Sequence, residues 1–283
     1  MTIFLSKGFN KCACGVLIGL SMVVGADCTA ADELVTDRPD QTESAVVVGP
    51  GRYQLEVGMT FTRDDEAGIR SEVFEGPGTL LRIGLTETVE LRLGMAGYLD
   101  EDVRSAAGRQ SENALGDGEI GLKWVLANER GRRPQMAVLV STSVPIGGDA
   151  FTSDEFDPEV RLALSHTLTD RVGLGYNLGV GWESSPGTEP ETVASYFYTV
   201  ALGIALSERW GFFLELYGSL ADEESVLDGA GTLQDIDDVH AFDGGWTYAL
   251  TDRMQLDLAA GLGLSDSADD RFISLGLSIR WPD

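Results

Sequence analysis

Cysteine is nearly absent from this chain of 283 residues, and its three copies all lie within the first 28 positions. Those positions have the layout of a secretory signal: Lys7 and Lys11 form a basic start, Val16–Gly25 is apolar, and small residues follow up to Ala30. The apolar stretch is shorter than the roughly 20 residues that a transmembrane helix needs. We therefore expect residues 1–30 to be a signal peptide, and the exported chain to have no thiol, disulfide or cysteine–metal site.

Basic residues are also scarce, because 20 Lys and Arg stand against 46 Asp and Glu, for a formal net charge of −26. Beyond the expected signal peptide a single lysine is left, Lys123. This balance argues against nucleic acid as a partner and against a basic patch that binds anionic lipid. The acidity fits solvated loops, or alternatively a surface that binds cations.

Histidine is limited to His166 and His240, and the order of the expected strands places them at opposite ends of the molecule. A hydrolase with a serine nucleophile needs a base beside that serine, and Ser165 and His166 point to opposite faces of a strand. The acidic runs Asp235–Asp238 and Asp266–Asp270 have no spacing typical of a calcium loop. We expect no enzyme, no catalytic residue, no metal site and no cofactor.

Helical periodicity is missing as well, and strict alternation of apolar with polar or small residues takes its place. In Val172–Trp182, for example, large apolar residues alternate with glycine and Asn177. About twelve such segments follow the expected signal peptide: Arg52–Asp64, Thr79–Leu85, Val89–Gly97, Gly118–Leu126, Met136–Val144, Glu159–His166, Val172–Trp182, Tyr196–Leu206, Phe212–Leu220, Phe242–Leu250, Met254–Leu264 and Ile273–Trp281.

One short phrase recurs four times between these segments: a Leu, a Ser or Thr, an acid, one further residue and an apolar residue. The copies begin at Leu85, Leu168, Leu206 and Leu250. Such a phrase predicts a tight hairpin turn in which the hydroxyl caps a backbone N–H, and its parity predicts an odd number of loop residues. With Asn128–Pro134, these turns form five short connections.

The other connections are longer and mostly acidic: Asp64–Gly78, Asp100–Leu115, Pro145–Pro158, Glu183–Glu191, Asp222–Val239 and Ser265–Arg271. Short turns at one end and long loops at the other are typical of a barrel in the bacterial outer membrane, with short periplasmic turns and longer extracellular loops. We therefore predict an all-β, antiparallel, up-and-down transmembrane β-barrel of about 12 strands over residues 52–283. The alternative is a soluble β-sandwich or periplasmic barrel.

The segments Val35–Ser44 and Gly49–Gly58, together with Val144–Gly148 and the turn that begins at Leu168, resemble a bacterial outer-membrane family. That family is named for a meta-pathway of phenol degradation and is often simply called transporter. The resemblance spans nearly the whole exported chain, with Ile146 where the family usually has Thr. It implies an envelope β-barrel and uptake of small, aromatic or hydrophobic molecules.

If the apolar face of the barrel meets lipid, the charged face must line the lumen, because a basic residue facing lipid at mid-membrane costs about 2–4 kcal/mol. The lumen-lining candidates are Glu56, Arg82, Glu90, Arg92, Glu119, Lys123, Glu159, Arg161, Glu215, Tyr217, Asp257 and Arg280. They form either an internal salt-bridge network or a selective polar path. Residues 31–51 form either a periplasmic lead or a plug.

The expected function is that of a passive outer-membrane channel or uptake protein for small molecules. The alternative is a structural or adhesive barrel with a plugged lumen, whose acidic loops carry the function. The expected partners are outer-membrane lipid, a small-molecule solute and the outer-membrane assembly machinery.

Overall fold

The computed structural model describes residues 34–184, 192–221, 225–227, 233–235 and 238–282, so the expected signal peptide lies outside the described residues. None of the described residues forms a helix long and apolar enough to cross a membrane. The strands are β1 (Tyr53–Glu66), β2 (Ile69–Gly84), β3 (Val89–Met95), β4 (Tyr98–Ser105), β5 (Gly108–Leu115), β6 (Gly118–Ala127), β7 (Gln135–Val144), β8 (Pro158–Thr169), β9 (Val172–Ser184), β10 (Thr192–Ala205), β11 (Trp210–Ala221), β12 (Ser225–Leu227), β13 (Leu233–Asp235), β14 (Val239–Thr251), β15 (Met254–Gly263) and β16 (Arg271–Trp281).

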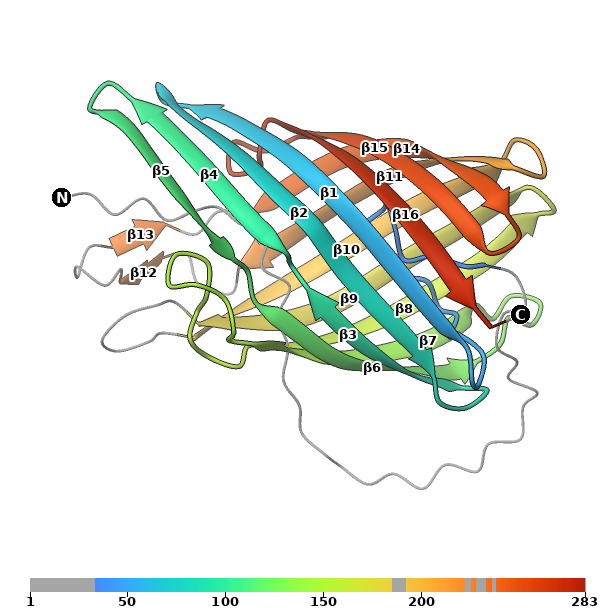
Figure 1. The fold of residues 1–283 in the computed structure, drawn as a ribbon. Helices are drawn as coiled ribbons and strands as arrows, with labels where there is room; N and C mark the ends of the chain where they lie inside the picture. Colours follow the sequence, from blue (N-terminus) through green and yellow to red (C-terminus); the bar gives the residue numbers. More distant parts are fainter. Residues whose placement is uncertain (1–33, 185–191, 222–224, 228–232, 236–237, 283) are drawn as a thin grey trace.

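Twelve of these strands close into one antiparallel ring (Figure 1). The order around the ring is β1-β16-β15-β14-β11-β10-β9-β8-β7-β6-β3-β2, and β2 pairs with β1 to close it. Closure removes the unpaired edges of a sheet, which a strand in lipid cannot leave unsatisfied. The predicted up-and-down barrel of about 12 strands is confirmed.

The wall extends beyond the ring at the long-loop end, where two predicted loops are wrong (Figure 1). β1 and β2 continue to a two-residue turn, Ala67–Gly68, in which both residues have positive φ, as a tight hairpin turn requires. Residues 100–115 form most of the hairpin β4–β5, which pairs with the far half of β2. β5 is exposed on both faces, so its sequence has no apolar alternation from which a strand could be predicted.

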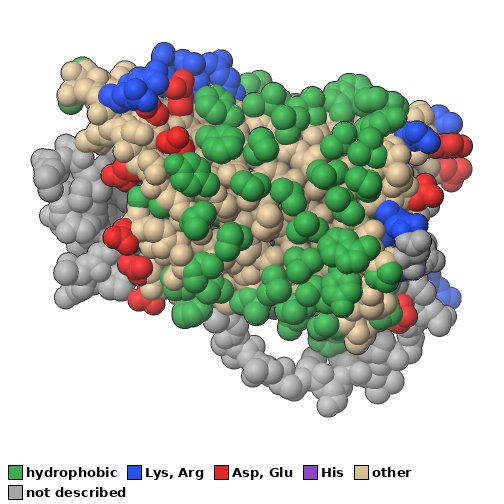
Figure 2. Space-filling model, viewed as in Figure 1, with side chains coloured by type: hydrophobic (Ala, Val, Ile, Leu, Met, Phe, Trp, Pro, Cys, Tyr) green, Lys and Arg blue, Asp and Glu red, His purple; other side chains and the backbone are tan. Residues whose placement is uncertain are grey.

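The outer surface of the ring is apolar (Figure 2). Leu122, Leu178 and Leu275 are 49%, 57% and 52% exposed, whereas the charged residues Glu90 and Lys123 are 0% exposed. This distribution inverts that of a soluble protein and is the one that a barrel in lipid requires. The barrel is therefore a membrane-spanning one.

Aromatic pairs lie on the wall close to the short turns. Tyr53 stacks on Trp281 with ring centroids 6.0 Å apart, and Trp210 contacts Tyr248 at 4.6 Å. Trp and Tyr side chains favour the membrane–water boundary, because they combine an apolar ring with a polar group. The pairs indicate where the barrel leaves the lipid at the short-turn end.

The same kind of hydrogen bond recurs in all four repeated turns. The hydroxyls of Thr86, Thr169, Ser207 and Thr251 each accept from the backbone N–H two residues later, at 3.2–3.3 Å. Two of the turns close with three loop residues; the other two have two loop residues and an adjacent bulge, which restores the parity. The hydroxyl cap predicted from the sequence is confirmed.

Candidate functional site

The barrel interior is filled with charged side chains. Of the twelve candidates predicted from the sequence, Glu119 is half-buried and the others are buried, and all occupy the inward-facing register of the wall. Burial of so many charges is tolerable only where they are paired and hydrogen-bonded. Their role in selecting a solute stays a prediction.

Three cations from neighbouring strands form the basic wall, defined here as Arg82 on β2, Arg92 on β3 and Lys123 on β6. Arg82 and Arg92 lie directly opposite one another in register and share Glu90, whose Oε1 is 2.9 Å from Arg82 Nε and 3.0 Å from an Arg92 nitrogen. Arg82 also contacts Glu56 on β1 at 3.2 Å. Two wall carboxylates do not balance three cations, so the wall leaves an excess of positive charge.

The N-terminal segment, residues 34–50, supplies the missing anions. Asp37 Oδ2 lies 2.6 Å from Arg92, 2.8 Å from Lys123 Nζ and 3.0 Å from Arg82. Its other oxygen, Oδ1, accepts hydrogen bonds from the backbone N–H and the hydroxyl of Ser44. Burial acts to raise the pKa of Asp37, but the three cations outweigh it and hold that pKa well below its ordinary value.

Glu43 is the second anion of the segment. Its two carboxylate oxygens accept from one Arg92 nitrogen at 2.9 and 2.8 Å. Its backbone is paired with the Asn177 side chain of β9: the Glu43 N–H donates to Asn177 Oδ1 at 2.7 Å, and Asn177 Nδ2 donates to the Glu43 carbonyl at 3.0 Å. An Asn side chain can imitate a peptide group in this way, so the wall fixes both the charge and the backbone of the segment.

The opposite side of the interior is the acidic wall, defined here as Glu215 on β11, Asp243 on β14 and Asp257 on β15. Arg38 of the segment reaches Asp257 at 3.2 Å and Ser274 at 2.9 Å. Glu215 accepts from the Gln41 N–H at 2.6 Å and from the Thr42 hydroxyl at 2.5 Å. This wall therefore meets one cation and several neutral donors.

The acidic wall also brings two carboxylates close together. Asp243 lies directly opposite Glu215 in register and is 1% exposed, and neither of its oxygens has a hydrogen-bond partner among the described residues. Asp40 of the segment adds a further carboxylate near Glu215 and Asp243. Burial, followed by repulsion from Glu215, raises the pKa of Asp40 well above its ordinary value. No group of His, Cys, Asp and Glu in the described part of the chain has the arrangement of a metal site.

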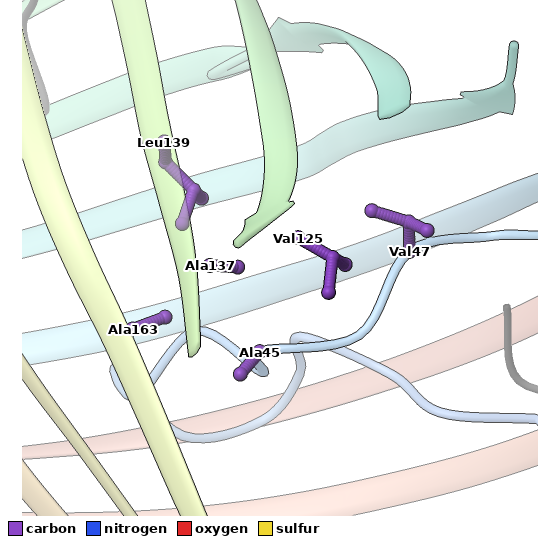
Figure 3. Close-up of a cluster of buried hydrophobic side chains, with 6 residues drawn as sticks. All are labelled: Ala45, Val47, Val125, Ala137, Leu139 and Ala163. Carbon is purple, nitrogen blue, oxygen red and sulfur yellow. The ribbon is translucent and has the colours of Figure 1, made fainter. Parts of the chain in front are cut away.

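Apolar packing holds the last part of the segment. Ala45 and Val47 contribute to a cluster with Val125 on β6, Ala137 and Leu139 on β7, and Ala163 on β8 (Figure 3). The Val48 N–H donates to Glu90 at 2.7 Å. A hollow beside Glu43, Arg92 and Arg161 has a volume of about 10 Å³, room for about one water. This hollow is thus too small for a solute.

Several interior residues escaped the sequence prediction, namely Gln54, Asn177, Thr199, Asp243, Ser274 and Ser278. The same alternation places them inward, but the prediction followed mainly charged residues, and Asp243 stands among glycines and aromatics.

The two histidines lie near opposite ends of the barrel, where His166 is within 3.4 Å of the Tyr176 hydroxyl and His240 within 3.0 Å of the Tyr198 hydroxyl.

The family model described as "Putative MetA-pathway of phenol degradation" matches residues 36–281, nearly all of the chain beyond the expected signal peptide. The chain belongs to this family. The match includes the interior segment from Thr36 onward as well as the barrel, and it confirms the resemblance noted in the sequence. No curated protein matches the chain.

Solved outer-membrane barrels share the fold. An outer membrane channel from Pseudomonas putida F1 is 16% identical, with a TM-score of 0.61 over 87% of this chain and 100% of that chain. The NanC porin is 8% identical, with a TM-score of 0.50 over 80% and 98%. The translocator domain of autotransporter NalP from Neisseria meningitidis is 9% identical, with a TM-score of 0.50 over 81% and 88%. The chain shares the β-barrel fold of these outer-membrane proteins. Together with its apolar outer surface, this fold places the protein in the bacterial outer membrane.

Proposed function

We propose that the protein is a passive outer-membrane channel for small molecules whose passage is closed by residues 34–50 and opens when this segment moves. The observation that carries the proposal is the location of Asp37, within 3.0 Å of three interior cations from β2, β3 and β6. The barrel strands can form their backbone hydrogen bonds without the segment, because the pairings that close the ring are between barrel strands. The segment is therefore an insert in the lumen, held by side chains.

The family description supports an aromatic or hydrophobic solute. The interior is polar, so a solute of that kind gains little from the charged walls while the segment is docked. A moved segment would expose Ala137, Leu139 and Ala163 as an apolar strip on one side of the passage. The twelve lumen-lining candidates, eleven charged residues and Tyr217, then act as the polar remainder of the path. The proposed domains are a signal peptide over residues 1–30, the segment within 31–51 and the barrel over 52–283.

Planar-bilayer conductance tests the proposal directly. We compare the exported chain with a variant that lacks residues 34–50 and with D37N/E43Q, which keeps the segment but removes its two anions from the basic wall. Both variants should give discrete currents that are larger or more frequent than those of the unaltered protein. D170N changes an exposed residue in one of the short turns. It is the control and should behave as the unaltered protein.

Folding is checked by the faster gel migration of an unheated barrel. If the folded deletion variant passes no current, the channel proposal is wrong. If it conducts no more than the unaltered protein, residues 34–50 do not close the passage.

The density of internal ion pairs favours a second function, a structural or adhesive barrel whose lumen is permanently filled. In that case the acidic loops carry the function. Liposomes loaded with the protein distinguish the two, because only a channel lets small aromatic solutes enter faster than protein-free liposomes do.

A further inference from the structure

Basic residues at the long-loop end are few and gather on one part of the wall. The connections at that end, with the strand ends beside them, carry lysine or arginine at five positions only: Arg63, Arg70, Arg104, Arg109 and Arg271. The connections 145–158, 183–193 and 221–240 have none. We call the five residues the arginine patch.

The register of the strands places the whole patch on one face. Arg63 continues the outward series of Met59 and Phe61 on β1, and directly paired residues of neighbouring strands share a face. Arg271 is paired with Arg63, and Arg70 with Arg104. Arg104 is in turn paired with Arg109. The patch thus lies outside the barrel across β16, β1, β2, β4 and β5, and Figure 2 shows basic side chains gathered at that end.

The acids that form ion pairs with the patch are fewer than its arginines. Asp65 contacts Arg63 and Arg70 at 2.9 and 2.8 Å. Glu72 lies 3.5 Å from Arg63 and 3.4 Å from Arg104. Asp102 pairs with Arg104 and Arg109.

Four of the five cations therefore share three acids, and Arg271 has no ion pair with any described residue. Three cross-strand pairs place arginine opposite arginine, which is unfavourable unless an anion lies between them. Asp102 supplies that anion for Arg104 and Arg109, whereas no acid of the described residues pairs with both Arg63 and Arg271.

An apolar hollow adjoins the patch on the side of the membrane. It has a volume of about 210 Å³ and is lined by Phe61, Arg63, Arg271, Phe272 and Ile273. Phe61 and Ile273 are 44% and 48% exposed and belong to the apolar belt. Two guanidinium groups thus stand at the boundary between that belt and water. An amphipathic ligand bound there would place its polar head group against the guanidinium groups and its apolar tail against the apolar side chains.

We propose that the arginine patch binds the phosphate groups of the phosphorylated glycolipid in the outer leaflet of the outer membrane. The long loops of such barrels face the outside, so the patch stands at the level of that leaflet's headgroups. Guanidinium groups bind phosphate through paired hydrogen bonds, and basic clusters at the membrane surface attract anionic lipid. The overall composition argued against a lipid-binding basic patch; the fold makes one by bringing scattered arginines to one face.

The test uses the full exported chain in neutral detergent and measures binding of the diphosphorylated glycolipid anchor by native mass spectrometry. The same glycolipid without its phosphates and phosphatidylglycerol are the comparison ligands. The unaltered protein should bind the phosphorylated glycolipid in preference to both. R63Q/R271Q should weaken that binding by roughly 30-fold, from about 1 kcal/mol per arginine at a membrane surface.

R171Q/R209Q is the matched control, because both arginines are exposed on the opposite, short-turn rim; it should bind as the unaltered protein does. Each variant is first shown to be folded by its faster migration when unheated. R63K/R271K should restore part of the affinity. Equal binding of the glycolipid with and without phosphate, equal binding of phosphatidylglycerol, or an unchanged affinity in folded R63Q/R271Q would each overturn the proposal.

Discussion

The two charged walls of the interior meet the same segment by different means. The basic wall, Arg82, Arg92 and Lys123, receives two carboxylates, and each oxygen of Asp37 has its partners. The acidic wall, Glu215, Asp243 and Asp257, receives one arginine, neutral donors and a further acid. The two walls are on opposite sides of the ring. If the segment moves as proposed, we expect the basic wall to fix it and the acidic wall to set how easily it leaves.

The largest effect should come from removing the charge of Asp37, the anion that contacts all three cations of the basic wall. D37N leaves three buried cations short of a partner, a loss of about 3 kcal/mol in docking of the segment. The expected result is an increase of about 100-fold in the labelling rate of a buried reporter, Val48→Cys, by a soluble maleimide. Residues 31–283 contain no other cysteine, so the signal is specific once the expected signal peptide is removed. An unchanged rate in D37N would mean that the basic wall does not hold the segment.

A matched neutral substitution on the acidic wall should do much less. E215Q keeps an oxygen that can accept from Thr42 or Gln41, and it removes repulsion toward Asp40 and Asp243. We expect the labelling rate of Val48→Cys to change by less than about fivefold, which corresponds to about 1 kcal/mol. An increase as large as that of D37N would contradict the asymmetry between the walls.

The two walls should also respond oppositely to pH. Because docking lowers the pKa of Asp37, its contribution is present above the ordinary value of 3.8 and is lost as pH falls from there toward the lowered value. Because docking raises the pKa of Asp40, its contribution is full below 3.8 and is lost as pH rises through the raised value.

Labelling of Val48→Cys, corrected for the pH dependence of thiol reactivity measured with a free thiol, should therefore increase at both extremes. D40N should remove the increase at the higher pH only. An upper limb that persists in D40N would assign it to another group.

The smallest effect should come from the apolar contact next to the basic wall. V47A removes two methyl groups from the cluster with Val125, Ala137 and Ala163, at a cost of about 1 kcal/mol. The labelling rate should rise about fivefold, without any change in its pH dependence. A pH shift in V47A would show that packing and the charged walls are coupled.

Much of the barrel follows from the sequence, because alternation is imposed by the two solvents on either side of the wall. Val172–Trp182 and Met254–Leu264 could be placed as strands since one face meets lipid and the other does not. β5 could not, because both of its faces meet water and nothing selects apolar residues on one side. The inward direction of Arg82 or Lys123 was predictable; their partners were not, because Asp37 is 45 residues from Arg82 and 86 from Lys123 in sequence.

By itself, then, the sequence determined a closed wall with an apolar outside, a charged inside and a direction marked by its repeated turns, since each is a local consequence of period-2 burial and hydroxyl capping. Only the tertiary structure decided that residues 34–50 lie among the interior charges and that five scattered arginines share one outer face. Both depend on which strands become neighbours when the ring closes, and that pairing brings together residues far apart in the chain.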